Sequence, residues 1–276
     1  MTTPQRRLLN DGHQLPLIGF GTWPLDDDQA TIAVDAALQA GYRLIDTAAR
    51  YGNEVGVGRG VRDSGIPRQD IVLTTKLRGS AHGYDNTLRG FDTSLKRLGT
   101  DYLDLYLIHW PQPTVNLYVE SWKAFIRLKE EGLVRSIGVS NFLPEHIDHL
   151  QQATGVLPAV NQIELHPNYS QLNLRQWLVQ KGILVQSWSP LGQGEELNQS
   201  AIQTLARKHD RTTAQIVLRW HLQLGLLPIP KSQNSQRIQQ NIAIFDFSLD
   251  QDDLAALATL EANHRLGEDP TSFTEE

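Results

Sequence analysis

The chain has 276 residues, and its 25 Lys and Arg residues against 31 Asp and Glu residues give a formal net charge of −6 at pH 7. This mildly acidic balance argues against nucleic acid or an anionic membrane as the main partner. The sequence has no cysteine, which excludes disulfides, thiolate nucleophiles, zinc–sulfur sites and iron–sulfur clusters. No apolar run approaches the roughly 18 residues of a membrane span, and the N-terminus lacks the apolar stretch of a signal peptide, so we expect a cytoplasmic protein.

The N-terminal segment predicts a β-hairpin over residues 8–17, because Asn10, Asp11 and Gly12 place turn-forming residues at its centre. Behind it, short runs rich in Val, Ile and Leu alternate with amphipathic stretches of helical length. The eight runs span residues 17–22, 43–47, 71–76, 103–109, 134–139, 159–164, 184–189 and 226–230. Their apolar residues are continuous rather than alternating, which is typical of parallel strands buried on both faces.

Helix signals lie between these runs. An acidic cluster at residues 26–28 begins the first amphipathic stretch, and Gly41 and Gly99 follow such stretches as helix stops. The alternation of strand and helix predicts a parallel sheet. Eight such units in a chain of this length predict an α/β fold of the (β/α)8 TIM-barrel type, which needs about 250 residues.

The alternative is a doubly wound open sheet, which is indicated by G-x-G-x-x-G after the first strand. Segment 19–24 lacks the third glycine of that fingerprint. No linker or change of composition divides the chain, so we expect a single barrel domain over residues 1–276. Its polar tail, residues 264–276, is expected to lie over the barrel as a loop or to be partly disordered.

Polar side chains end three neighbouring runs, and functional residues of such barrels lie at the carboxyl ends of the strands. Asp46 ends the second run with Tyr51 just beyond it, Lys76 ends the third, and His109 ends the fourth. An ammonium beside a tyrosine favours the phenolate and lowers its pKa from about 10, and Asp46 would hold Lys76 in place. This set would protonate a carbonyl oxygen while a cofactor delivers hydride to the carbon.

The segment around Asp46 resembles the signature of the aldo-keto reductases. It reads Gly-Tyr-Arg-Leu-Ile-Asp-Thr-Ala-Ala-Arg-Tyr-Gly-Asn-Glu over residues 41–54. Further matching segments follow in order over essentially the whole chain, at residues 74–77, 104–111, 138–142, 161–167 and 229–232. The short segment after His109 is most similar to the prokaryotic branch, which contains 2,5-diketo-D-gluconate reductases.

The resemblance implies that Tyr51 is the general acid, that Lys76 and Asp46 tune it, and that His109 orients the substrate carbonyl. It also implies that Trp188 lies against the nicotinamide ring. The remaining implied cofactor contacts are Ser140, Asn141, Gln162, Ser189, Leu191, Lys231, Ser232, Arg237 and Asn241.

The residues after the last run indicate an anion site in their own right. Lys231 and Ser232 follow the strand, and Arg237 lies about one and a half helical turns beyond them. Two cations at a helix start suit a 2′-phosphate, and residues 232–237 contain no acidic side chain to bind a ribose diol. The segment therefore favours NADPH over NADH, unless the two cations form only a solvated basic face.

Three residues near the rim are expected to line the substrate pocket. Trp23 and Trp110 lie at strand ends, where the alternative is simple packing. Arg78 stands where many relatives have a large aromatic residue. We hypothesise that it favours carbonyl compounds with a carboxylate or phosphate, the alternative being that it points into solvent.

The predicted function is NADPH-dependent reduction of small aldehydes, dicarbonyls or keto-sugars by a monomer that needs no metal. Two other functions stay open. One is a cofactor-binding regulatory subunit with the same fold and little turnover, and the other is an unrelated barrel enzyme that uses the anion site without a nicotinamide. Taken alone, Asp46 and Lys76 could also be no more than a buried structural ion pair.

Overall fold

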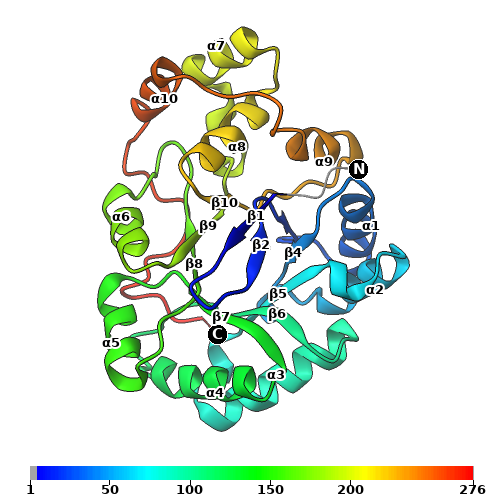
Figure 1. Ribbon diagram of the computed structural model, residues 1–276, viewed down its shortest axis with the longest axis vertical. Helices are drawn as coiled ribbons and strands as arrows, with labels where there is room; N and C mark the ends of the chain where they lie inside the picture. Colours follow the sequence, from blue (N-terminus) through cyan, green and yellow to red (C-terminus); the bar gives the residue numbers. More distant parts are fainter. Residues whose placement is uncertain (1–4, 276) are drawn as a thin grey trace.

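The eight apolar runs form eight parallel strands in the computed structural model, which describes residues 5–275 (Figure 1). The strands are β3 Phe20–Gly21, β4 Leu44–Asp46, β5 Val72–Leu77, β6 Leu103–Ile108, β7 Val134–Ser140, β8 Val160–Glu164, β9 Leu184–Trp188 and β10 Leu227–Pro228. Neighbours pair in chain order from β3 to β10. The sheet closes because the N–H groups of Gly19 and Gly21 donate to the carbonyls of Pro228 and Pro230, at 3.0 Å each. The predicted (β/α)8 barrel is confirmed.

Helices surround the barrel, as crossover connections between the strands and, in the case of α9, after the last strand. They are α1 Asp27–Gln39, α2 Glu54–Asp63, α3 Tyr84–Leu98, α4 Tyr118–Glu130, α5 Pro144–Thr154, α6 Leu172–Gln180, α8 Thr213–Gln223 and α9 Ser235–Ile242. Two more, α7 Ser200–His209 and α10 Gln251–Ala258, lie together outside this ring (Figure 1). The acidic cluster begins α1 as predicted, because the Asp26 side chain accepts the Gln29 N–H at 2.8 Å.

A β-hairpin closes the amino-terminal mouth of the barrel. It consists of β1 Arg6–Leu8 and β2 Gln14–Pro16, which pair antiparallel as predicted. Leu9 and Leu15 are buried in one cluster with apolar side chains of the barrel interior. Solvent is therefore excluded from the barrel core at this end.

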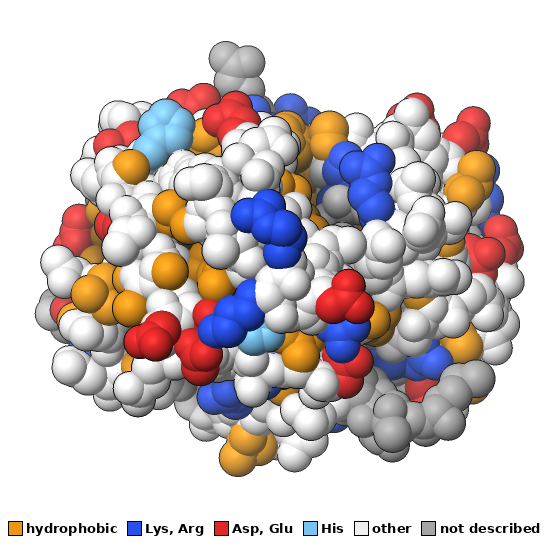
Figure 2. All heavy atoms as spheres, turned by 90° about the horizontal axis from the view of Figure 1, so that it is seen from above, with side chains coloured by type: hydrophobic (Ala, Val, Ile, Leu, Met, Phe, Trp, Pro, Cys, Tyr) orange, Lys and Arg blue, Asp and Glu red, His pale blue; other side chains and the backbone are white. Residues whose placement is uncertain are grey.

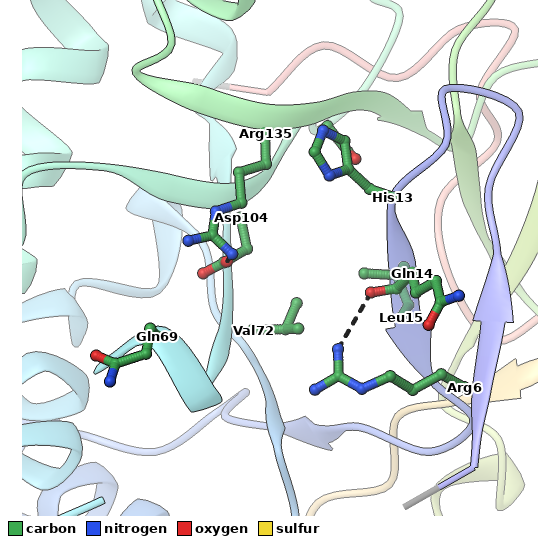
Figure 3. A pocket seen from close by; sticks show the side chains of 9 residues that line it. Arg6, His13, Gln14, Leu15, Gln69, Val72, Asp104 and Arg135 are labelled. Carbon is green, nitrogen blue, oxygen red and sulfur yellow. Dashed lines mark hydrogen bonds and ion pairs between the residues drawn. The ribbon is translucent and has the colours of Figure 1, made fainter. Parts of the chain in front are cut away.

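A small pocket of about 140 Å³ lies beside the hairpin at the same end (Figure 3). Its charged wall includes Asp104, whose carboxylate accepts from Arg68 at 2.7 Å and from the Leu73 N–H at 3.0 Å. Arg135 lies 3.3 Å from the same carboxylate. These contacts bind β6 to its neighbours, so Asp104 has a structural explanation.

The tail crosses the opposite, carboxyl end of the strands as an irregular segment. Glu164, the last residue of β8, accepts the N–H groups of Leu266 and Gly267, at 2.6 and 2.9 Å. Farther along, the Phe273 ring lies 4.7 Å from the Trp110 ring, centroid to centroid. The tail thus covers part of the rim at which the sequence places the reacting residues.

The outer surface carries charges of both signs. On the face shown in Figure 2, Lys and Arg side chains are interspersed with Asp and Glu side chains. Within residues 5–275, no helix is long and apolar enough to cross a membrane.

Candidate active site

The four residues singled out as catalytic meet at the carboxyl end of the barrel. Asp46 ends β4, Lys76 lies near the end of the adjacent β5, and His109 follows the next strand, β6. Tyr51 ends the short 3₁₀ turn η1, Ala49–Tyr51, just beyond β4. Because neighbouring parallel strands end on one rim, the chain brings all four together.

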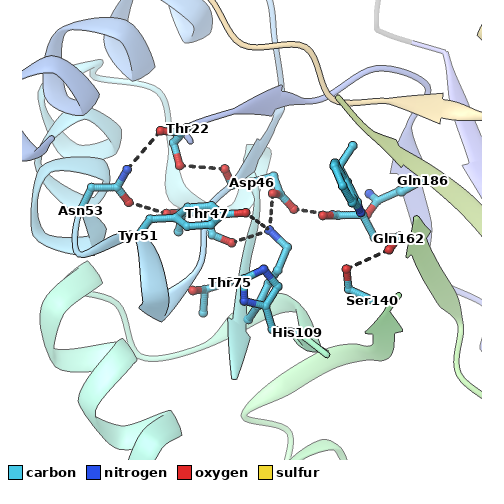
Figure 4. Close-up of polar contacts among 12 residues, drawn as sticks. Thr22, Asp46, Thr47, Tyr51, Asn53, Thr75, His109, Ser140, Gln162 and Gln186 are labelled. Atoms are coloured by element: carbon cyan, nitrogen blue, oxygen red, sulfur yellow. Dashed lines mark hydrogen bonds and ion pairs between the residues drawn. The ribbon is translucent and has the colours of Figure 1, made fainter. Parts of the chain in front are cut away.

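Lys76 is the centre of this group. Its ammonium donates to the Asp46 carboxylate at 2.5 Å, to the Thr47 carbonyl at 2.9 Å and to the Tyr51 hydroxyl at 3.4 Å (Figure 4). The Lys76 side chain is fully buried, and Asp46 is nearly so. The ion pair is therefore held away from solvent, with its cation directed at the tyrosine oxygen.

The pKa of Tyr51 is raised, whereas the sequence analysis expected it to be lowered. Burial raises this pKa, and the nearby Lys76 ammonium acts against burial without reversing it. Asp46 and Glu275 add negative charge and raise the pKa further. Tyr51 therefore holds its proton at neutral pH.

The pKa of Lys76 is set by the same two opposing effects. Burial alone would lower it, but the Asp46 carboxylate and the Tyr51 oxygen outweigh burial and raise it. Lys76 is accordingly charged at neutral pH, and a cation faces a protonated phenol.

A buried amide positions the turn that carries Tyr51. Asn53 is fully buried and donates to the carbonyls of Thr22 and Leu25, at 3.2 and 2.9 Å. Its side-chain oxygen accepts the Thr47 hydroxyl at 2.7 Å (Figure 4). The chain just after η1 is thereby tied to the segments that follow β3 and β4, which limits the movement of the tyrosine.

One glutamine holds the other oxygen of Asp46, and a second glutamine contacts the first. Gln162 donates to this oxygen at 2.7 Å and also contacts the Gln186 side-chain oxygen at 3.0 Å (Figure 4). The sequence analysis passed over Gln186. The sequence feature that indicates Gln186 is its position as a polar residue inside the buried run of β9. A buried amide needs hydrogen-bond partners, so such a residue is expected to contact other polar groups.

Three more predicted residues lie around the same rim and contact one another. Asn141 donates to the His109 carbonyl at 3.1 Å and accepts the Trp188 indole N–H at 2.8 Å. The Ser140 hydroxyl donates to the Gln162 carbonyl at 2.8 Å. Ends of β7, β8 and β9 are thus joined into one polar surface next to the catalytic group. Ser189 and Leu191, which follow β9, are only partly buried.

The predicted phosphate residues lie between β10 and α9. Lys231 and Arg237 are exposed, whereas Ser232 and Asn241 are buried. Asn234 caps α9 by accepting the Arg237 N–H at 3.0 Å, and its own N–H donates to the Ser232 hydroxyl at 3.1 Å. Two exposed cations therefore flank a helix start, as the sequence predicts.

The three predicted pocket residues differ in exposure. Trp110 is buried against Phe273, and its ring lies 6.3 Å from the His109 ring. Trp23 is 52% exposed. Arg78 is exposed and precedes the turn η3, Gly79–Ala81. Phe273 was not predicted from the sequence, because its contact with Trp110 depends on the path of the tail.

A second buried charge cluster joins the tail to the rim. His166 is fully buried between Glu164, at 2.9 Å, and Glu196 of the turn η5, Glu196–Asn198. Burial alone would lower the pKa of His166, but its contacts with both carboxylates raise this pKa to about 9. Because Glu164 also holds the tail at Leu266, the charge of His166 stabilises the covered rim.

We expect this cluster to make stability depend on pH. A histidine whose pKa rises from about 6.5 to about 9 on folding stabilises the fold fully below pH 6.5. That contribution is lost as the pH rises to about 9, and it amounts to about 3 kcal/mol at most. Urea unfolding of the parent and of His166→Gln at pH 6 and pH 9.5 measures it. The difference in unfolding free energy between the parent and His166→Gln should be smaller at pH 9.5 than at pH 6. An equal difference at the two pH values would refute this role of His166.

Comparison with known proteins places the chain in a family. The model of the Aldo/keto reductase family matches residues 17–262. An aldo-keto reductase of Mycolicibacterium smegmatis is 53% identical over 268 residues, which cover 97% of this chain and 98% of that protein. Methylglyoxal reductase DkgA of Escherichia coli K12 is 45% identical over 275 residues, 99% of each chain. The protein therefore belongs to the aldo/keto reductase family and is an oxidoreductase.

A solved structure agrees with this assignment. A mutant of Gox0644, crystallised in complex with NADPH, superposes with a TM-score of 0.94 at 46% sequence identity and covers 99% of both chains. The prokaryotic branch indicated by the sequence is in keeping with the bacterial relatives.

Proposed function

We propose that the protein reduces aldehydes or ketones to alcohols with NADPH, and that Tyr51 is the proton donor. The observation that carries this proposal is a protonated tyrosine beside a buried, charged Lys76, with His109 on the same rim. DkgA is named a methylglyoxal reductase, and the Gox0644 mutant binds NADPH, which supports both the reaction and the cofactor. Small aldehydes, dicarbonyls and keto-sugars are the proposed substrates.

The residues present fit NADPH. Lys231, Ser232 and Arg237 form a donor set with two cations, which suits a 2′-phosphate. Amide and hydroxyl groups of Asn141, Ser140 and Gln162 suit the nicotinamide carboxamide, and Trp188 offers an aromatic face beside them. When bound, NADPH supplies the hydride, which no side chain can donate. Ser189, Leu191 and Asn241 are proposed as further contacts.

The protein's own residues supply the proton and stabilise the negative charge that develops. Tyr51 transfers its proton to the carbonyl oxygen, which gains negative charge as the carbon is reduced. Lys76 stabilises the phenolate that remains, and Asp46 keeps Lys76 charged and in position. His109 donates a hydrogen bond to the same carbonyl oxygen and so orients the substrate.

The cofactor assignment predicts a selective effect at Arg237. Arg237→Gln should raise the KM for NADPH about tenfold or more, because it removes charge-assisted hydrogen bonds to the 2′-phosphate. The KM for NADH, which lacks this phosphate, should change less than about twofold. Arg207→Gln, an exposed arginine on α7, is the matched control. An equal change in KM for NADPH and for NADH would refute the assignment of Arg237 to a 2′-phosphate site.

NADPH consumption with a panel of small aldehydes, dicarbonyls and keto-sugars tests the function itself. Turnover supports the proposal and ranks the substrates. Tight NADPH binding without turnover on any of them would favour the regulatory subunit. Absence of NADPH binding would refute the proposed cofactor site.

A further inference from the structure

The side chain of Glu275 is buried inside the candidate active site. One carboxylate oxygen lies 2.8 Å from Nδ1 of His109 and 3.6 Å from the Arg50 guanidinium. The other accepts the Gly79 N–H at 2.9 Å. None of the Glu275 side chain is exposed to solvent. Glu275 thus occupies one ring nitrogen, Nδ1, of a residue proposed to hold the substrate.

The neighbouring backbone and rings hold this carboxylate in place. Gln112 donates to the Glu275 carbonyl at 3.1 Å, and Arg50 lies over the Phe273 ring at 5.4 Å. A Cβ on Gly79 would lie 2.6 Å from the Glu275 carbonyl oxygen, so the approach is open only to glycine at that position. The end of the tail therefore docks through several specific contacts.

Glu275 is ionised in this position. Burial by itself raises the pKa of its carboxyl, but His109, the Gly79 N–H and Arg50 outweigh burial and lower it. An anion beside His109 conflicts with the proposed reaction, because the carbonyl oxygen that His109 is proposed to hold gains negative charge. Glu275 also contributes to the raised pKa of Tyr51, which opposes proton transfer.

We propose that Glu275 is a built-in competitor of the carbonyl substrate: its carboxylate occupies the carbonyl-binding position at His109, and a substrate binds there only after the tail has left. This inference rests on the proposed function. If the substrate binds only to molecules whose tail is undocked, its apparent dissociation constant equals the intrinsic constant divided by the fraction of such molecules. A small undocked fraction therefore weakens the apparent affinity. At saturating substrate the tail is displaced, so the turnover number is unaffected.

The variant Glu275→Gln tests this directly, because it keeps the shape of the side chain and removes its charge. We expect the KM for methylglyoxal to fall about tenfold while kcat changes less than about twofold, because charge-assisted hydrogen bonds are lost from the closed state only. Glu268→Gln is the matched control, since Glu268 is an exposed carboxylate of the same tail. It should leave both constants unchanged.

A second variant acts on docking without removing the carboxylate. Phe273→Ala deletes the ring packed on Trp110, and it should lower KM in the same direction as Glu275→Gln. A role of Glu275 in orienting His109 gives the opposite pattern: kcat falls, KM does not, and the pH profile of kcat shifts. That pattern, or unchanged constants, would overturn the proposal.

Binding of benzoate, a carboxylate that is not reduced, gives a readout independent of turnover. Calorimetry of the NADPH-loaded protein should show benzoate binding about tenfold tighter to Glu275→Gln than to the parent. Equal affinities would overturn the competition even if the parent reduces methylglyoxal well. Lack of turnover by the parent with tighter benzoate binding by the variant would refute the proposed function and leave the competition standing.

Discussion

Tyr51→Phe is expected to lower kcat for carbonyl reduction about 1,000-fold, because a positioned general acid contributes 10²- to 10⁴-fold. The loss should appear in kcat, since the phenol acts on the carbonyl oxygen as it gains charge and not on cofactor binding. Affinity for NADPH, measured by fluorescence titration, should stay within about twofold of the parent. Steady-state kinetics with one aldehyde and one dicarbonyl measure the effect.

Tyr102→Phe is the matched control for this experiment. The Tyr102 ring packs against the guanidinium groups of Arg68 and Arg135, beside the structural Asp104 at the other end of the barrel. Loss of its hydroxyl should leave kcat unchanged. Turnover by Tyr51→Phe at more than about a tenth of the parent rate would assign the proton to another donor.

Asp46→Asn is expected to affect both folding and catalysis. It leaves the fully buried Lys76 ammonium without a charged partner, and breaking a buried ion pair in this way costs about 3–5 kcal/mol of unfolding free energy. The pKa of Lys76 falls because burial is no longer opposed by the carboxylate. Urea unfolding should show the loss of stability, and kcat should fall because Lys76 no longer stabilises the phenolate.

A double variant separates the two roles of the pair. Asp46→Asn combined with Lys76→Met removes both charges, and it should regain much of the lost stability because no unpaired charge remains buried. It should not regain activity. A double variant as active as the parent would show that the pair is only structural.

The barrel was predictable because its signals are local. Each buried strand is a continuous apolar run, and the acidic helix start and the hairpin turn act on neighbouring residues. The four rim residues followed from their positions at the ends of consecutive strands. Helices α7 and α10 were not predicted, because the expected alternation assigns one helix to each strand.

Other features depend on contacts that no spacing in the sequence indicates. Glu275 reaches His109 across 166 positions, and Glu196 meets His166 from a different loop. The direction of the Tyr51 pKa likewise depends on how completely the folded chain excludes water from the site. The single domain over 1–276, the monomeric state and the cytoplasmic location stay predictions.

Isotope transfer tests the central claim, carbonyl reduction by NADPH at the Tyr51 site, most directly. The protein is incubated with methylglyoxal and NADPH that carries two deuterium atoms at C4 of the nicotinamide, and the product is analysed by mass spectrometry and NMR. We expect an alcohol with one deuterium on the former carbonyl carbon for each NADPH oxidised, and almost no such alcohol with Tyr51→Phe in the same time. An alcohol without deuterium, or NADPH that binds and is not oxidised with any carbonyl compound, would contradict it.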